Sequence, residues 1–228
     1  MRRALLVLVF AGVVAAGAWY AVTRFRQADS AAATDSAAAA PRAPKAITLP
    51  ALGETCGARC GVQRWPVKTL SDPSRELVNL TPVATTVEEL AAIPRPGRFP
   101  QLGRNAPVEL TTYEVTGCLG IIDRQPEADG DIHLVIGGLR DRRISLIAEV
   151  PDPGCEGVCQ SGLGYLYATV RATLDSALAS GRVSPECNND VPLIQVTGVG
   201  FFDRAHGQRG AAPNYIELHP VLGVTFPD

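Results

Sequence analysis

VELTTYEVTGCLGII, residues 108–122, alternates apolar and polar side chains and is rich in β-branched residues. Such alternation is typical of a β-strand with one buried face. The next residues, DRQPEADGD (123–131), contain the proline, aspartate and glycine that favour a turn. Two further strands are predicted beyond it, DIHLVIGG (131–138) and RRISLIAEV (142–150). The fold therefore begins as a three-stranded meander.

A helix and a second pair of strands follow the meander. LGYLYATVRATLDSALASG (163–181) places apolar residues three and four positions apart, which predicts an amphipathic helix that ends at Gly181. VPLIQVTGVGFFD (191–203) and YIELHPVLGVTF (215–226) predict two more strands. The order β-β-β-α-β-β is that of an OB-fold. We therefore expect residues 108–228 to form a mainly β (α+β) domain, an OB-like five-stranded barrel.

The N-terminus has the features of an export signal. Residues 4–22 contain no charge and follow Arg2 and Arg3. The stretch is long enough to cross a bilayer as a hydrophobic helix, and Ala16-Gly17-Ala18 (16–18) offers a cleavage site. Residues 1–26 are therefore a signal anchor or a cleaved signal peptide. Residues 27–46, rich in Ala, Ser and Pro, are predicted to be a flexible linker.

Residues 47–107 are irregular and rich in proline, and we interpret them as an extension packed on the barrel. CGVQRWPVKTLSD (60–72) contains an apolar stretch that could be a strand, with Trp65 as a buried anchor. Thr86-Val87-Glu88-Glu89 (86–89) has the pattern of a capping box, which predicts a short helix over 87–92.

The cysteines support export from the cytoplasm. All six follow the hydrophobic segment, and an even number suits an oxidising compartment. Six cysteines allow fifteen pairings, which the sequence does not distinguish. Two C-x3-C pairs could instead form a zinc site, although export favours disulfides. The disulfide candidates are Cys56, Cys60, Cys118, Cys155, Cys159 and Cys187.

The charge distribution argues against nucleic acid as a partner. The whole chain has a formal charge of −2, and residues 1–26 contain four arginines and no acid. The remainder carries 17 basic and 23 acidic residues. A mildly acidic domain lacks the positive surface with which proteins bind phosphate backbones. We therefore expect a membrane partner through residues 4–22 and no nucleic acid.

A candidate site lies in the two loops with which OB-folds usually bind ligands, here 123–131 and 203–214. Because side chains alternate along a strand, Asp131 and His133 point away from the core that Ile132 enters. By the same argument, Glu217 and His219 point away from the core that Ile216 and Leu218 enter. The candidate ligand-binding residues are Asp131, His133, His206, Gln208, Asn214, Glu217 and His219.

These residues allow three interpretations. Histidines near loop ends often hold a loop by hydrogen bonds, histidine–carboxylate clusters can bind a metal ion, and such pairs can act as acid and base. Ring nitrogens of His133 and His219 within about 4 Å of each other or of a carboxylate would favour a metal. The sequence has no G-x-S-x-G elbow and no phosphate-binding glycine loop. We therefore assign no catalytic residue, no metal ligand and no cofactor.

Five segments resemble a family of bacterial secreted domains. They are RWPVKTLSD (64–72), TTVEEL (85–90), DGDIHLVI (129–136), IAEVPDPGC (147–155) and GVGFFDRAHGQRGAAPNYIELHPVL (198–222). The resemblance spans roughly residues 56–222. It implies export and a single domain, and it brings no established activity.

A more distant similarity links the chain to the thermonuclease family, whose enzymes also use an OB barrel. DGDIH (129–133) and RISLIAEVPD (143–152) are similar to two catalytic segments of that family. Ile132 stands where the family has threonine, and the spacing from Arg143 to the acids departs from the catalytic pattern. No catalytic site is therefore transferred.

Two functions are expected from these observations. The first is a non-catalytic binding or structural module outside the cytoplasm, whose loops 123–131 and 203–214 contact a cell-envelope ligand or protein. The second is a metal-dependent hydrolase of the phosphodiesterase type, which would use the acids and histidines of DGDIH and IELH (216–219).

Overall fold

The computed structural model describes residues 47–54, 56–123, 129–181, 193–205 and 207–227. The predicted leader and linker, most of loop 123–131, Cys187 and His206 lie outside these ranges. Within them, no helix is long and apolar enough to span a membrane.

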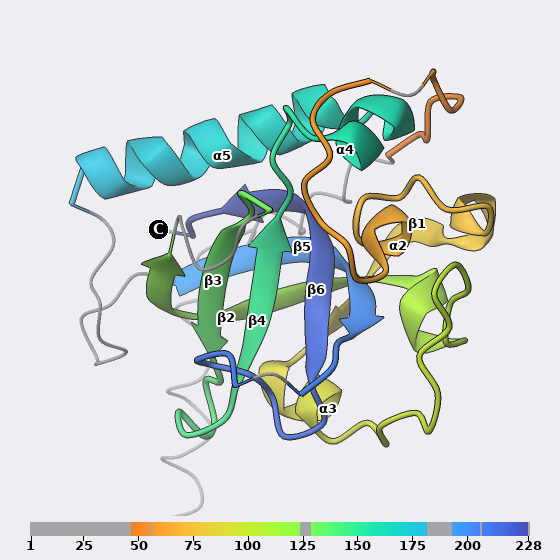
Figure 1. The fold of residues 1–228 in the computed structure, drawn as a ribbon. Helices are drawn as coiled ribbons and strands as arrows, with labels where there is room; N and C mark the ends of the chain where they lie inside the picture. Colours follow the sequence, from red (N-terminus) through yellow and green to blue (C-terminus); the bar gives the residue numbers. More distant parts are fainter. Residues whose placement is uncertain (1–46, 55, 124–128, 182–192, 206, 228) are drawn as a thin grey trace, which may run out of the picture. The chain divides into compact units, whose positions relative to one another are not determined.

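Five strands form a closed barrel, which confirms the predicted fold class (Figure 1). β2 pairs with β3, β3 with β4 and β5 with β6 in antiparallel fashion, while β4 and β6 run parallel. Antiparallel pairing of β2 with β5 closes the circle. The strands are β2 (Thr111–Asp123), β3 (Ile132–Gly137), β4 (Ser145–Val150), β5 (Leu193–Phe202) and β6 (Ile216–Thr225).

The predicted helix lies across one end of the barrel as α5 (Gly164–Ala179) (Figure 1). It buries Tyr167, Val170 and Leu174, whereas Leu178, four residues after Leu174, is 39% exposed. Gly181 follows the C-cap residue with a φ of 71°, a left-handed conformation that glycine adopts without strain. A further helix, α4 (Glu156–Ser161), lies between β4 and α5.

The extension contributes several short elements to the domain. α2 (Trp65–Lys68) corrects the strand expected in this stretch, because Pro66 in the first helical turn favours a helix start. Trp65 is buried as predicted. β1 (Asn79–Thr85) was not expected and runs parallel to β2. The remaining elements are α3 (Val87–Ala91) and two 3-10 helices, Arg75–Leu77 and Val108–Leu110.

The capping box at the start of α3 is confirmed. The amide of Glu89 donates to the Thr86 hydroxyl at 3.1 Å, and the Glu89 carboxylate accepts from the Thr86 amide at 3.1 Å. We expect Thr86→Ala to lower the free energy of unfolding by about 1 kcal/mol, because it leaves an amide of the first turn without its partner. Chemical denaturation measures this. Thr86→Ser keeps the hydroxyl and should restore most of the stability, and an equal loss in both variants would contradict this role.

Two disulfides join the extension to the region around α4. They link Cys56 with Cys159 and Cys60 with Cys155, and no cysteine of the described residues is free. The pairing corrects the alternative of a zinc site made by the two C-x3-C pairs. Disulfides persist in oxidising compartments, so the structure agrees with an extracytoplasmic location.

A buried ion pair anchors the extension beside the barrel. Arg64 donates to both carboxylate oxygens of Glu109 at 2.8 and 2.7 Å, and to the carbonyl of Phe202 at 3.0 Å. Its guanidinium also lies 4.6 Å from the centre of the Phe201 ring. Because Arg64 immediately precedes α2, these contacts fix the position of Lys68 one helical turn later.

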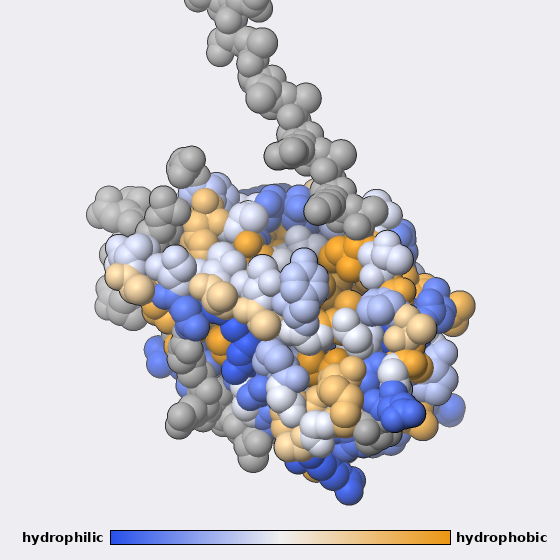
Figure 2. Space-filling model, turned by 90° about the horizontal axis from the view of Figure 1, so that it is seen from above, coloured by the Kyte–Doolittle hydropathy of each residue, from blue (hydrophilic) through white to orange (hydrophobic). Residues whose placement is uncertain are grey.

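The surface on the α5 side mixes hydrophilic and hydrophobic side chains (Figure 2). Exposed apolar residues such as Val62 and Tyr165, both 81% exposed, come from separate segments of the chain. Scattered apolar residues are ordinary on soluble proteins.

Candidate functional site

Strand register brings acids and histidines of three strands together. His133 of β3 lies opposite Glu149 of β4. β4 and β6 pair in parallel, with Ile147 opposite Glu217. Two residues further along each strand, where the side chains point to the same face again, Glu149 and His219 are therefore neighbours. Asp131 immediately precedes β3. The sequence thus places these side chains on one face of the barrel wall, as the alternation predicted.

That face is covered by other segments of the chain rather than open to solvent. Asp131, His133, Glu217 and His219 are 1%, 4%, 1% and 0% exposed. The alternation identifies the side to which each residue points, but it does not show that another segment packs there. The buried charged cluster consists of Lys68, Asp129, Asp131, His133, Glu149, Asp203, Glu217 and His219.

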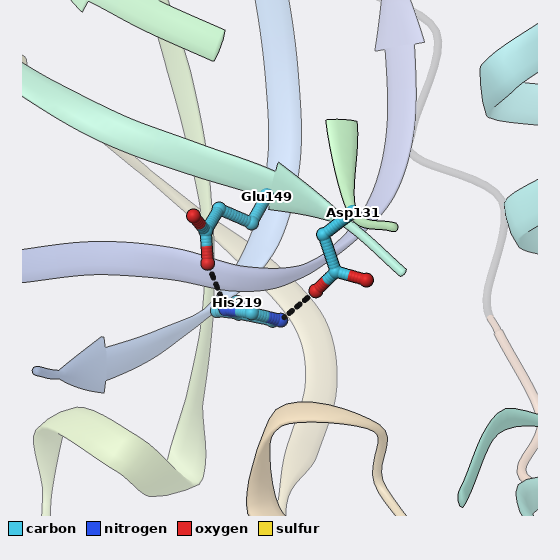
Figure 3. A group of neighbouring side chains, drawn as sticks. All are labelled: Asp131, Glu149 and His219. Atoms are coloured by element: carbon cyan, nitrogen blue, oxygen red, sulfur yellow. Dashed lines mark ion pairs between the residues drawn. The ribbon is translucent and has the colours of Figure 1, made fainter. Parts of the chain in front are cut away.

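His219 lies between two carboxylates at the centre of this cluster (Figure 3). Its Nδ1 is 2.7 Å from Oε2 of Glu149, and its Nε2 is 3.1 Å from Oδ2 of Asp131. Both are ion-pair distances, yet neither nitrogen has a hydrogen-bond partner in aligned geometry. Burial and the Lys68 ammonium lower the pKa of His219, but the two carboxylates raise it more, to above its usual value.

The other oxygens of these carboxylates are held by the protein. Oε1 of Glu149 lies 3.1 Å from Nδ1 of His133, whose Nε2 is 3.1 Å from the carbonyl of Arg209. Oδ1 of Asp131 accepts from the amide of Asp152 at 3.1 Å. Both partners of His133 are acceptors, so its ring donates to both only as an imidazolium. Burial lowers the pKa of His133, but the bond to Glu149 raises it more.

Lys68 is a cluster member that the sequence analysis missed. Its ammonium lies 3.5 Å from Oε2 of Glu149 and 3.8 Å from Oδ2 of Asp203. Burial lowers the pKa of Lys68, but Glu149, Glu217 and Asp203 raise it well above its usual range, so the side chain stays charged. One feature of the sequence indicates that Lys68 is buried: it follows Pro66 closely in a predominantly apolar stretch.

Glu149 was likewise absent from the candidate residues. Burial alone would raise its pKa, but His219, His133 and Lys68 hold the pKa of Glu149 well below its usual range. The carboxylate is therefore ionised at neutral pH. The burial of Glu149 could have been predicted from the sequence, because this residue lies in a predicted strand with apolar neighbours on both sides.

Loop 203–214 is hydrogen-bonded to the extension at both ends and to β4 at Gly210. Asn214 donates to the carbonyls of Leu90 and Ile93, both at 2.8 Å, and accepts from the amide of Ile216 at 3.2 Å. The hydroxyl of Ser145 donates to the carbonyl of Gly210 at 3.0 Å. Asn214 therefore orders the loop, which agrees with the structural interpretation of these residues.

The first end of the loop is held through Asp203, whose Oδ1 accepts from Gln63 at 3.1 Å. Between the ends, Arg204 and Arg209 are exposed and Gln208 is half-buried. His206, the remaining candidate, lies outside the described residues. The structure thus separates the predicted site into an interior charged cluster and an exposed basic loop.

Two kinds of chemistry follow from this separation. The cluster can stabilise charge, bind a cation or hold protons inside the protein, whereas only the loop can touch a large molecule from outside. Comparison with protein-family models, with curated proteins and with solved structures gives no match for the chain.

Proposed function

We propose that the protein is a non-catalytic binding module outside the cytoplasm, which uses loop 203–214 to bind an anionic group of a cell-envelope glycan or protein. One observation carries the proposal: both ends of the loop are hydrogen-bonded to the extension that packs on the barrel, while Arg204 and Arg209 are exposed between them. A pre-ordered loop loses little conformational entropy on binding. Guanidinium groups are suited to carboxylates and phosphates.

The hydrolase alternative receives less support from the geometry. A general acid or base must come within hydrogen-bond distance of the group it protonates or deprotonates. Asp131, Glu149 and His219 are at most 2% exposed, so a polymer or nucleic-acid substrate does not reach them in this conformation. The cluster accordingly supports the loop rather than acting on a substrate.

Co-sedimentation with purified, insoluble cell-wall glycan that carries anionic groups tests the proposal. The double variant Arg204→Ala/Arg209→Ala should bind at least roughly tenfold more weakly than the unaltered chain, because each charge-assisted hydrogen bond contributes about 1.5–3 kcal/mol. Binding should also weaken as salt is added.

A matched control removes two exposed arginines elsewhere. Arg140→Ala/Arg143→Ala changes the β3–β4 turn and leaves loop 203–214 intact. It should bind as the unaltered chain does. Equal binding by both double variants, or no binding by the unaltered chain, would refute the assignment of the loop.

A further inference from the structure

The interior cluster contains a set of convergent metal-ligating atoms. One atom each from Asp131, Glu149 and His219 lies within 4.8 Å of the other two. Each comes from a different part of the barrel wall: the start of β3, β4 and β6. Two ligand atoms about 2.1 Å from one ion are at most about 4.2 Å apart, so the side chains need to draw slightly closer for one ring nitrogen and both carboxylates to reach the same ion.

A second observation is that these groups are imperfectly satisfied by one another. His219 is fully buried, yet both ring nitrogens and Oδ2 of Asp131 lack an aligned hydrogen bond. A buried polar atom without such a partner costs about 1–3 kcal/mol. A cation bound to one ring nitrogen and to both carboxylates would satisfy that nitrogen and Oδ2 of Asp131, since coordination uses lone pairs rather than N–H groups.

The surroundings match those of protein metal sites. The second oxygen of each carboxylate is held, Glu149 by His133 and Asp131 by the amide of Asp152. Such outer hydrogen bonds orient ligands and are a regular part of metal centres. Lys68 lies 3.5 Å from Oε2 of Glu149 and 3.8 Å from Oδ2 of Asp203, so its ammonium would have to turn toward Asp203 when the ion binds.

We propose that Asp131, Glu149 and His219 bind one divalent transition-metal ion, for which Zn²⁺ is the best match, and that this ion fastens β3, β4 and β6 together. One imidazole and two carboxylates form a mixed N/O donor set that suits Zn²⁺ better than Ca²⁺ or Mg²⁺, which prefer oxygen alone. The site is structural because it is closed to substrates, and it does not depend on the proposed binding function.

Metal analysis of the tag-free full chain tests this proposal. After dialysis against Zn²⁺ and removal of excess metal, we expect about one Zn²⁺ per chain. A hundredfold excess of Zn²⁺ over its Kd should raise the Tm of chelator-treated protein by roughly 5–10 °C. Co²⁺ should give a d–d absorption spectrum without a thiolate charge-transfer band, since the proposed ligands include no cysteine.

Variants distinguish the ligands from their neighbours. His219→Gln and Asp131→Asn should lose the bound Zn²⁺ and the rise in Tm, whereas His133→Gln should still bind Zn²⁺ with a roughly 10–100-fold weaker affinity, because His133 only orients Glu149. If either ligand variant fails to fold, the Tm shift and Co²⁺ spectrum of the unaltered chain still decide. No stoichiometric metal and no Tm shift, or loss of metal only in His133→Gln, would overturn the proposal.

Discussion

Replacing Glu149 by alanine is expected to lower the free energy of unfolding by about 3–5 kcal/mol, the usual cost of removing one partner from a buried ion pair. Glu149 is 2% exposed and lies within 3.5 Å of His133, His219 and Lys68. Its removal leaves these buried cationic groups without their shared carboxylate. Urea denaturation in the presence of a chelator measures the loss without a contribution from bound metal.

The matched control is Glu114→Ala, which removes a half-buried carboxylate from β2 outside the cluster. It should change the free energy of unfolding by no more than about 0.5 kcal/mol. A loss below about 1 kcal/mol for Glu149→Ala would show that the cluster is hydrated and not the closed interior described above.

The second large effect is expected from the disulfides. Cys56–Cys159 and Cys60–Cys155 span 103 and 95 residues and are nested, with three residues between the cysteines on either side. While one bond is present, the other closes only a short additional loop. Cys60→Ala/Cys155→Ala should therefore cost about 2–3 kcal/mol, and removal of both bonds clearly more, since the long loop is then open.

Chemical denaturation of the two single-bond variants and of the four-cysteine variant checks this expectation. Cys56→Ala/Cys159→Ala serves as the comparison and should lose a similar amount to the first variant, because the nested loops are alike. If removal of one bond costs as much as removal of both, the bonds do not act as a nested pair.

Most of the barrel could be predicted because its strands and its helix each follow one periodicity. The alternation in residues 108–122 and the three-and-four spacing in 163–181 both report a single buried face. β1 escaped prediction because its short segment is mostly exposed or half-buried and contains Pro82. α2 was mistaken for a strand because four residues are too few to show a period.

The candidate site was predicted only in part, for a physical reason. Alternation showed that His133 and His219 point to the same side, and the structure places both within 3.1 Å of a carboxylate. The alternation could not show that this side is buried, because the residues that pack against it come from distant segments of the chain. Lys68 belongs to this group through a contact with Glu149, 81 residues later in the chain, which no local pattern encodes.

The central claim is that the histidines of β3 and β6 belong to the interior of the protein and not to an open active site. Modification by diethyl pyrocarbonate, followed residue by residue with mass spectrometry, tests it most directly. We expect His133 and His219 to react at least roughly a hundredfold more slowly in the folded protein than in urea-unfolded protein, because their rings are 4% and 0% exposed. Reaction of both at the rate of the unfolded chain would contradict the account.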